Sequence, residues 1–260
     1  EAHNSIDSYA GTGVFKSTNG GVTWTKLTNV PVIAPTSTQT GPTYYTSSVL
    51  AVDVVKNRIW LGFLRRRQGT SSYNGALYKS SDGGATWTRI SPSGPPTELQ
   101  FPFITDLVFD PARTDTVYAA SGNAFGQPAE GFSRNGIYKS TNGGTTWMRL
   151  TNGLPSLANT GRINLAICSS IPSVLFASIV VPTGASTNGG KLEGVYKTID
   201  GGSTWTKIYT PSYVSGSGAL ADNWLGEQGW YNNVIAVHPT DTGIVYAGGV
   251  NLMKSTNGGR

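Results

Sequence analysis

The chain has 260 residues, among them 34 Gly, 14 Pro and a single Cys, and its formal net charge is +5 at pH 7. This length can bury a sizeable core without covalent staples, and the lone Cys168 excludes an internal disulfide. Only two histidines, His3 and His238, are present, so the composition argues against a metalloenzyme and we expect neither metal nor cofactor.

Short strands are predicted in a fixed order along the chain. An apolar first strand is expected at 49–55, 104–110, 163–169 and 234–238, and a second at 58–63, 116–120, 174–180 and 243–247. Turns with Asp or Pro separate the two, as in Asp110-Pro111. A third strand such as 136–139 then leads through a Gly-Gly hairpin into a fourth, such as 146–150.

The hairpin segment recurs five times, with the pattern Lys, Ser/Thr, any residue, Asn/Asp, Gly, Gly; four copies continue into Thr-Trp. The copies occupy 16–24, 79–87, 139–147, 197–205 and 254–260. Their Ser or Thr residues lie 57 to 63 residues apart, which indicates one repeated structural unit. Four strands per repeat and almost no helical periodicity predict an all-β protein, a β-propeller of four-stranded antiparallel blades. A two-sheet sandwich is the alternative.

We expect one propeller region over residues 1–260, with about four to five blades present. The partial blades are 1–27 and 233–260, and the blades between them are approximately 49–90, 104–150 and 163–208. Because both ends fall inside a blade, the chain is expected to be a fragment of a larger propeller with further blades outside it.

The hairpin segment resembles the Asp-box, or bacterial neuraminidase repeat, of sialidases, sortilin-type receptors and xyloglucanase-type glycosidases. The usual form of that motif, Ser-x-Asp-x-Gly-x-x-Trp, stands unchanged at 80–87. The resemblance covers nearly the whole chain and implies the propeller fold and export from a bacterial cell. It says little about function, since one fold hosts many activities.

The box residues are expected to be structural. A short Asn or Asp side chain caps the turn, Gly-Gly supplies positive φ, and the Trp ring buries apolar area beside the hairpin. Asn and Asp replace one another between copies, which argues against a metal ligand or a catalytic acid. The residues concerned are Ser17, Asn19, Trp24, Ser80, Asp82, Trp87, Ser140, Asn142, Trp147, Thr198, Asp200, Trp205, Ser255 and Asn257.

The basic residues do not predict nucleic-acid binding. Nine of the 19 Lys and Arg residues occupy the positions before the box or after its Trp, so the propeller disperses them over successive blades. Function is instead expected on the loops of the other face, because long loops on a rigid scaffold carry most binding and chemistry. These loops are 64–75, 122–135 and 181–194 between second and third strands, and 28–48, 91–102, 151–162 and 209–232 between blades.

Three groups of loop residues are candidates for a site. The first is aromatic: Trp224, Trp230 and Tyr231 lie among amides and acids in 222–232, a composition that suits sugar rings or plain blade packing. The second is basic and would clamp a carboxylate, as the arginine triad of sialidases does. Its members are Arg65, Arg66, Arg67, Arg134, Arg162 and Lys191. The Arg-Ile-Pro signature of sialidases is missing, and a solvated charge run is the alternative.

The third group is acidic and consists of Glu98, Glu130, Glu193, Asp222 and Glu227. Most glycosidases use two carboxylates, about 5 Å apart for retention or about 6.5 to 9.5 Å apart for inversion, and the sequence does not show which of these acids converge. Glu130, Asp222 and Glu227 are the catalytic candidates.

The sequence alone favours a secreted or cell-surface propeller that binds glycan or an extracellular protein without catalysis. The alternatives are a glycoside hydrolase of sialidase or xyloglucanase type and a structural component of a surface assembly. No membrane span is seen in the sequence.

Overall fold

The computed structural model describes residues 13–30, 47–63, 66–68, 71–73, 76–90, 104–122, 134–182, 189–211 and 224–259. The chain divides into two compact units, Glu1–Ile104 and Thr105–Arg260, and each is described by itself. Among the helices of the described residues, none is long and apolar enough to span a membrane.

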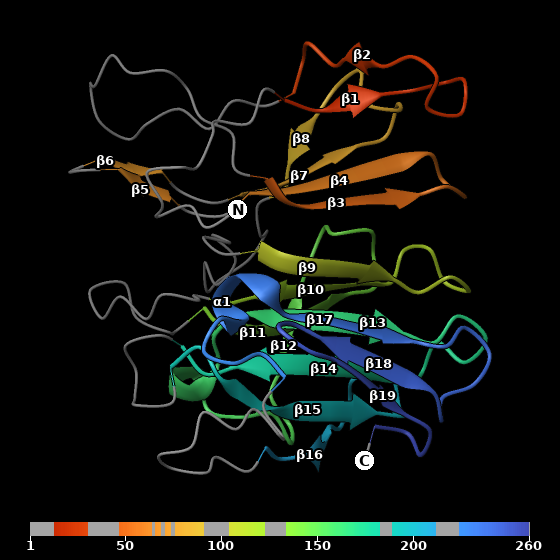
Figure 1. Ribbon diagram of the computed structural model, residues 1–260. Coiled ribbons are helices and arrows are strands. Elements are labelled where there is room, and N and C mark those ends of the chain that lie inside the picture. Colours follow the sequence, from red (N-terminus) through yellow and green to blue (C-terminus); the bar gives the residue numbers. More distant parts are fainter. Residues whose placement is uncertain are drawn as a thin grey trace. The chain divides into compact units, whose positions relative to one another are not determined.

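The first unit contains one antiparallel four-stranded sheet in the order β3-β4-β7-β8. Its strands are β3 (Ser47–Asp53), β4 (Arg58–Phe63), β7 (Ala76–Ser80) and β8 (Thr88–Arg89). Two short antiparallel pairs accompany it: β1 (Phe15–Lys16) with β2 (Thr25–Lys26), and β5 (Arg66–Gln68) with β6 (Ser71–Tyr73). These strands are labelled in Figure 1.

The second unit contains two four-stranded sheets and one three-stranded sheet, all antiparallel (Figure 1). The first comprises β9 (Ile104–Phe109), β10 (Val117–Ser121), β11 (Gly136–Ser140) and β12 (Met148–Leu150). The second comprises β13 (Ile163–Ile167), β14 (Leu175–Val180), β15 (Leu192–Thr198) and β16 (Thr206–Tyr209). The third comprises β17 (Val234–Val237), β18 (Val245–Gly248) and β19 (Leu252–Ser255). The 3₁₀ helix η2 (Leu157–Asn159) and the helix α1 (Gly229–Asn232) precede β13 and β17.

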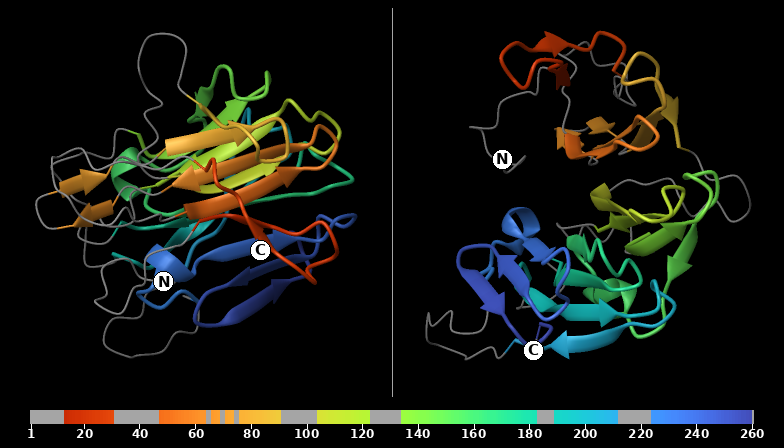
Figure 2. Two further views of the ribbon diagram at one scale, coloured as in Figure 1. Left: turned by 90° about the horizontal axis from the view of Figure 1, so that it is seen from above. Right: turned by 90° about the vertical axis from the view of Figure 1, so that its right-hand side faces the viewer.

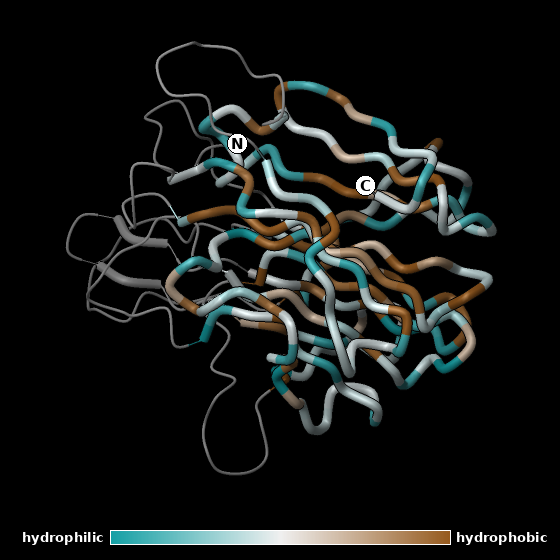
Figure 3. The backbone as a smooth tube through the Cα atoms, turned by 90° about the horizontal axis from the view of Figure 1, so that it is seen from below, coloured by the Kyte–Doolittle hydropathy of each residue, from teal (hydrophilic) through white to brown (hydrophobic). Residues whose placement is uncertain are grey.

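Sheets whose four strands follow one another in chain order are the blades of a β-propeller, so the predicted fold class is confirmed. The blade core lies between neighbouring sheets. In the second unit, one cluster joins Tyr118 and Leu150 to Leu175 and Trp205, and a second joins Phe176 and its neighbours to the sheet of β17. Figure 2 shows these sheets nearly end-on in its right-hand view, and Figure 3 shows hydrophobic segments along the strands and hydrophilic ones at turns.

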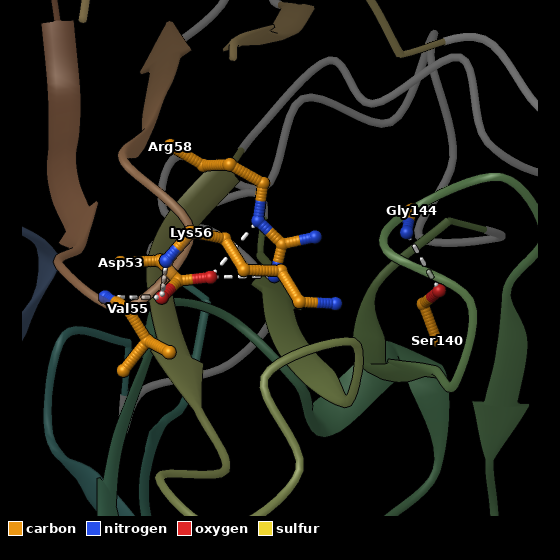
Figure 4. A network of polar contacts seen from close by, with 6 residues as sticks. All are labelled: Asp53, Val55, Lys56, Arg58, Ser140 and Gly144. Atoms are coloured by element: carbon orange, nitrogen blue, oxygen red, sulfur yellow. Dashed lines mark hydrogen bonds and ion pairs between the residues drawn. The ribbon is translucent and has the colours of Figure 1, made fainter.

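The predicted first strands all end too late, by one residue for 104–110 and 234–238 and by two residues for 49–55 and 163–169. The expected first strand 49–55 ends at Asp53 because this carboxylate closes the turn, accepting the amides of Val55 at 3.1 Å and Lys56 at 3.2 Å (Figure 4). Arg58, at the start of β4, forms an ion pair of 2.5 Å with the same buried carboxylate. Val54 and Val55 are therefore exposed turn residues in spite of their apolar side chains.

Candidate functional site

The five hairpin boxes share one pattern of hydrogen bonds. In the third box the amide of Gly144 donates to the Ser140 hydroxyl at 2.9 Å (Figure 4). That hydroxyl donates to the side-chain oxygen of Asn142 at 3.0 Å, and the oxygen also accepts the amide of Thr146 at 2.9 Å. The first two bonds recur in every other box, so the segment closes its own turn.

Asn and Asp are interchangeable in the box because the Thr hydroxyl changes its role. Asn142 donates from Nδ2 to Thr146 Oγ1 at 2.8 Å, whereas Thr204 Oγ1 donates to Asp200 Oδ2 at 2.6 Å. Hydrogen bonds from the Thr204 side chain and backbone, and from Thr198, lower the pKa of Asp200 to about 2. Equivalent bonds, led by the Thr86 hydroxyl, lower the pKa of Asp82. These carboxylates are ionised caps of a turn, which makes them poor proton donors for catalysis.

The box tryptophans differ in burial. Trp24, Trp87 and Trp147 each donate the ring N–H to the carbonyl of their own box at 3.0 to 3.2 Å. Trp205 instead packs in the core beside Tyr118 and Leu150 and is only 4% exposed. The expectation that every box ring is buried is wrong for Trp24, which is 62% exposed because the two-stranded pair β1–β2 leaves its ring uncovered by the described strands.

The lysine before the box packs on a ring of its own blade in four copies and bonds to the next box in two. Each of four such lysines holds its ammonium 5.1 to 5.7 Å from the ring of its cross-strand neighbour on the second strand. The Lys139 ammonium also donates to the carbonyl of Gly201 in the next box at 2.7 Å, and Tyr118 donates to the same oxygen at 3.0 Å. In the first unit Lys16 makes the equivalent bond to Gly83 at 3.0 Å.

The predicted loop face lies at the opposite end of the second unit's strands from the boxes, and there α1 and η2 are found (Figure 1). Among the predicted site residues, Arg65, Glu98, Glu130 and Asp222 lie outside the described residues. Arg66 and Arg67 lie in β5 of the first unit. Arg134 precedes β11, where its carbonyl accepts the Tyr138 hydroxyl at 3.0 Å. The predicted arginine clamp as a whole stays a prediction.

The aromatic candidates separate into a buried and an accessible part. Trp224 is only 5% exposed, and its ring centroid lies 5.2 Å from that of Tyr209 at the edge of the core, with the two rings tilted. Its expected place on a sugar platform is therefore wrong, because the blade junction covers its ring. Trp230 and Tyr231 lie on α1 with ring centroids 4.3 Å apart, and Tyr231 is 41% exposed. The Tyr231 hydroxyl donates to the side-chain oxygen of Gln228. Among the loop residues that the structure describes, this pair is the aromatic surface.

The described loop acids have cationic partners. Glu227 is exposed and lies 3.6 Å from the Lys191 ammonium. The Glu193 carboxylate accepts hydrogen bonds from the Tyr196 hydroxyl at 2.7 Å and from the Lys207 ammonium at 2.9 Å. Burial raises the pKa of Tyr196, and the hydrogen bond to Glu193 raises it further. Glu193 is therefore tied into its own blade, whereas Glu227 faces solvent beside α1.

A carboxylate that the sequence reasoning missed lies on the first strand of its blade. Asp106 of β9 accepts the amide of Leu165 on β13 at 2.8 Å and the Asn164 side chain at 3.2 Å. Burial raises the pKa of Asp106, opposed by these hydrogen bonds and by the charge of Arg162. Arg162 donates from Nε to Asn164 Oδ1 at 3.2 Å, and burial lowers its pKa against the attraction of Asp106. The available signal was an acid inside an otherwise apolar strand, Ile104 to Phe109.

A cavity of about 270 Å³ opens at the loop end between the blades of β9–β12 and β13–β16. Apolar side chains form most of its wall, among them Ile137, Leu157 and Ile179, and Arg149 lies at its edge. Its volume is slightly below the usual range for ligand pockets.

The chain is similar to two curated enzymes of glycan hydrolysis. It is 24% identical over 219 residues to the xyloglucanase Xgh74A of Acetivibrio thermocellus, a match that covers 78% of this chain and 23% of that enzyme. It is also 24% identical over 208 residues to a xyloglucanase of a Paenibacillus species, covering 77% of this chain and 19% of that enzyme. The chain thus spans about a quarter or less of these relatives. No model of a known protein family matches it.

Two solved structures share the fold. A GH74 enzyme of Niastella koreensis superposes with a TM-score of 0.57 and 23% identity, over 95% of this chain and 34% of that protein. An ancestral GH74 enzyme gives a TM-score of 0.53 and 21% identity, over 94% of this chain and 28% of that protein. The xyloglucanase relatives support the glycoside hydrolase alternative better than the non-catalytic binder that the sequence alone favours.

Proposed function

We propose that the chain forms blades of a glycoside hydrolase of the xyloglucanase type, which acts on a β-glucan outside the cell. The observation that carries this proposal is the similarity to two xyloglucanases over more than three quarters of the chain. Because the chain spans only a small part of each relative, we assign it the binding of substrate and leave the place of the catalytic acids open. The comparisons give no equal support to the sialidase type.

The accessible pair on α1 supports a role in substrate binding. A sugar ring stacks its C–H face on an aromatic side chain, and its hydroxyl groups bond to nearby amides and carboxylates. Tyr231 and Trp230 supply such rings, with the Gln228 amide and the Glu227 carboxylate on the same short segment. A polymer of sugars lying across this face would meet them side by side.

The proposal is tested with the intact protein on xyloglucan, with an unbranched β-glucan and an aryl sialoside as comparison substrates. Release of reducing ends from xyloglucan is expected, and none of the sialoside should be cleaved. Replacing Tyr231 or Trp230 by Ala should raise the KM for xyloglucan about two- to ten-fold, as expected for the loss of one aromatic contact, with little change in kcat.

Tyr246→Ala is the matched control, because Tyr246 is 38% exposed but lies on β18 away from α1. An unchanged KM in the two α1 variants would remove this surface from the binding site. Retention on immobilised xyloglucan without any hydrolysis would replace the hydrolase with the non-catalytic glycan binder.

A further inference from the structure

Arg162 is positioned by the protein at one edge only. The side chain is half-buried at the loop end of β13, where Nε donates to Asn164 and the Asp106 carboxylate supplies the counter-charge. Asp106 itself is held by the Leu165 amide, so this part of the network is rigid. Within the described part of the chain, neither Nη group of Arg162 has a hydrogen-bond partner. Through such a free edge, a planar guanidinium can donate two parallel hydrogen bonds to a carboxylate.

Asn232 supplies a hydrogen-bond acceptor that lacks a donor among the described residues. Its side-chain oxygen is buried and has no hydrogen-bond partner among the described residues, and its Nδ2 lies a long 3.5 Å from the Gln228 side chain. Buried polar atoms without partners are rare in folded proteins, and they mark places where a water, an ion or a ligand completes the bonding. This orphaned oxygen is independent of the unused guanidinium edge.

The repeat places these two residues at corresponding positions of adjoining blades. The turn amides of Asp110, Cys168 and His238 each donate to the carbonyl six residues further on, which aligns the first strands of the three blades. In that alignment Asn232 corresponds to Arg162, one blade apart. Corresponding positions of adjoining first strands do meet, since Thr105 donates to the carbonyl of its counterpart Ile163 at 2.7 Å, and β13 and β17 are in contact.

We propose that Arg162 and Asn232 form a binding site for a small carboxylate that carries a neighbouring hydroxyl, the chemistry of a uronic acid. The carboxylate accepts from the two Nη groups of Arg162, and the hydroxyl donates to the Asn232 oxygen. Asp106 supplies a negative charge near the guanidinium and thereby favours a monoanion over a dianion. The site stands whether or not the protein hydrolyses a β-glucan, because no residue of α1 other than Asn232 takes part.

The experiment measures binding to the intact protein by calorimetry and by ligand-observed NMR, with three probes. D-Glucuronate carries both groups, D-glucose lacks only the carboxylate, and acetate lacks the hydroxyl. A Kd on the order of 1 mM is expected for glucuronate, as for a ligand of this size. Glucose and acetate should each bind at least about ten-fold more weakly, since each loses one of the two contacts.

Variants separate the site from a general affinity for anions. Arg162→Lys keeps the charge but removes the fork, and it should weaken glucuronate binding about ten-fold or more. Asn232→Ala should weaken glucuronate and leave acetate unchanged, because only the hydroxyl contact is lost. Arg113→Lys is the matched control: it makes the same change at an exposed arginine at the opposite end of the blade, without touching the site.

Equal binding of glucose and glucuronate would overturn the proposal, as would glucuronate binding that Arg162→Lys leaves unchanged, or no binding of glucuronate at all. Thermal unfolding of each variant checks the fold. If Arg162→Lys unfolds, Asn232→Ala decides, since the contrast between glucuronate and acetate is read within one variant. A protein that does not hydrolyse xyloglucan still provides a valid test of glucuronate binding at this site.

Discussion

At the residue scale, the box shows that hydrogen-bond geometry matters more than charge. The Asn142 and Asp200 oxygens both accept a backbone amide four residues on, at the same distance of 2.9 Å. Only the last bond, to the Thr hydroxyl, reverses its direction. A hydroxyl can do this because it is both donor and acceptor. The two kinds of box therefore differ in how they respond to acid.

We predict that Asp200→Asn keeps the fold at neutral pH and removes one source of acid sensitivity. The folded-state pKa of Asp200 is about 2, below its usual 3.8, so its carboxylate stabilises the fold fully above the usual value. That stabilisation is lost as pH falls through about 4 to about 2. The Tm of the variant should fall less steeply over this window than that of the wild type, while at neutral pH it changes by no more than about 2 °C.

The control for this prediction is Asn142→Asp, which introduces a carboxylate into the equivalent box. This variant should make the fall of Tm with decreasing pH steeper over the same window. Circular dichroism melts at a series of pH values provide the measurement. Wild-type and Asp200→Asn curves that superimpose from neutral pH to about pH 2 would contradict the prediction.

Residue roles that depend on the local segment were predictable, and those that depend on a neighbouring blade were not. The alternation of Asn and Asp predicts a cap rather than a catalyst because all its partners lie within five residues. Trp24 and Trp205 end the same motif, yet one is 62% and the other 4% exposed, since distant strands decide what covers the ring. Trp224 was misplaced on the surface for the same reason.

At the element scale, the blade of β9–β12 is joined to the blade of β13–β16 by a lysine and an aromatic residue acting together. Lys139 and Tyr118 are cross-strand neighbours on β11 and β10, and both donate to the Gly201 carbonyl in the following box. Burial lowers the pKa of Lys139 and raises that of Tyr118 to about 12, which is the cost of placing both groups at a packed junction. The carbonyl keeps one donor if the other is lost.

We predict that Lys139→Met and Tyr118→Phe are each destabilising by about 1 kcal/mol, since one hydrogen bond is removed while the carbonyl stays satisfied. The double variant should lose about 1 kcal/mol more than the two single losses together, because the Gly201 oxygen is then left without either donor. Urea unfolding of the four proteins in the cycle measures this coupling. Strictly additive losses would show that the two groups act independently.

The order and pairing of the elements were largely predictable, because period-two hydrophobicity and the Gly-Gly hairpins are local signals. The end of β3 was not, since Asp53 closes its turn two residues before the apolar run stops. The candidate site was the least predictable part. Asp106 lies on one blade and Leu165 on the next, and a contact between residues 59 positions apart leaves no trace in either local sequence.

At the scale of the whole molecule, the repeat distributes much of the positive charge, since nine of the 19 Lys and Arg residues stand before a box or after its Trp. The lysines before the boxes are placed one to a blade, and four of the five lie over an aromatic ring. Binding of a phosphate backbone needs several cations along one line, whereas the repeat places these lysines on separate blades. Fold and function also separate at this scale, since blades of this kind suit many ligands.

We predict that the protein does not bind a DNA duplex of about 20 base pairs at about 150 mM salt with a Kd below about 10 μM. Fluorescence anisotropy of a labelled duplex measures this. At low salt, where weak binding is expected, replacing three of the box lysines by neutral residues should lower the affinity for the duplex only in proportion to the number of charges removed. Tight binding with a steep dependence on salt would reveal a basic groove that the repeat does not predict.

The exchange of roles by the Thr hydroxyl bears on chemical ageing. Three of the boxes contain Asn followed by Gly, at Asn19, Asn142 and Asn257, and such pairs are prone to lose the side-chain amide as ammonia. Loss of ammonia proceeds through a cyclic imide, and water opens that imide to aspartate or to isoaspartate. The aspartate is the residue that the second and fourth boxes already use, with the Thr proton turned toward it. Isoaspartate lengthens the backbone by one carbon and breaks the register of the turn, so only the aspartate product leaves these hairpins more acidic with their shape kept.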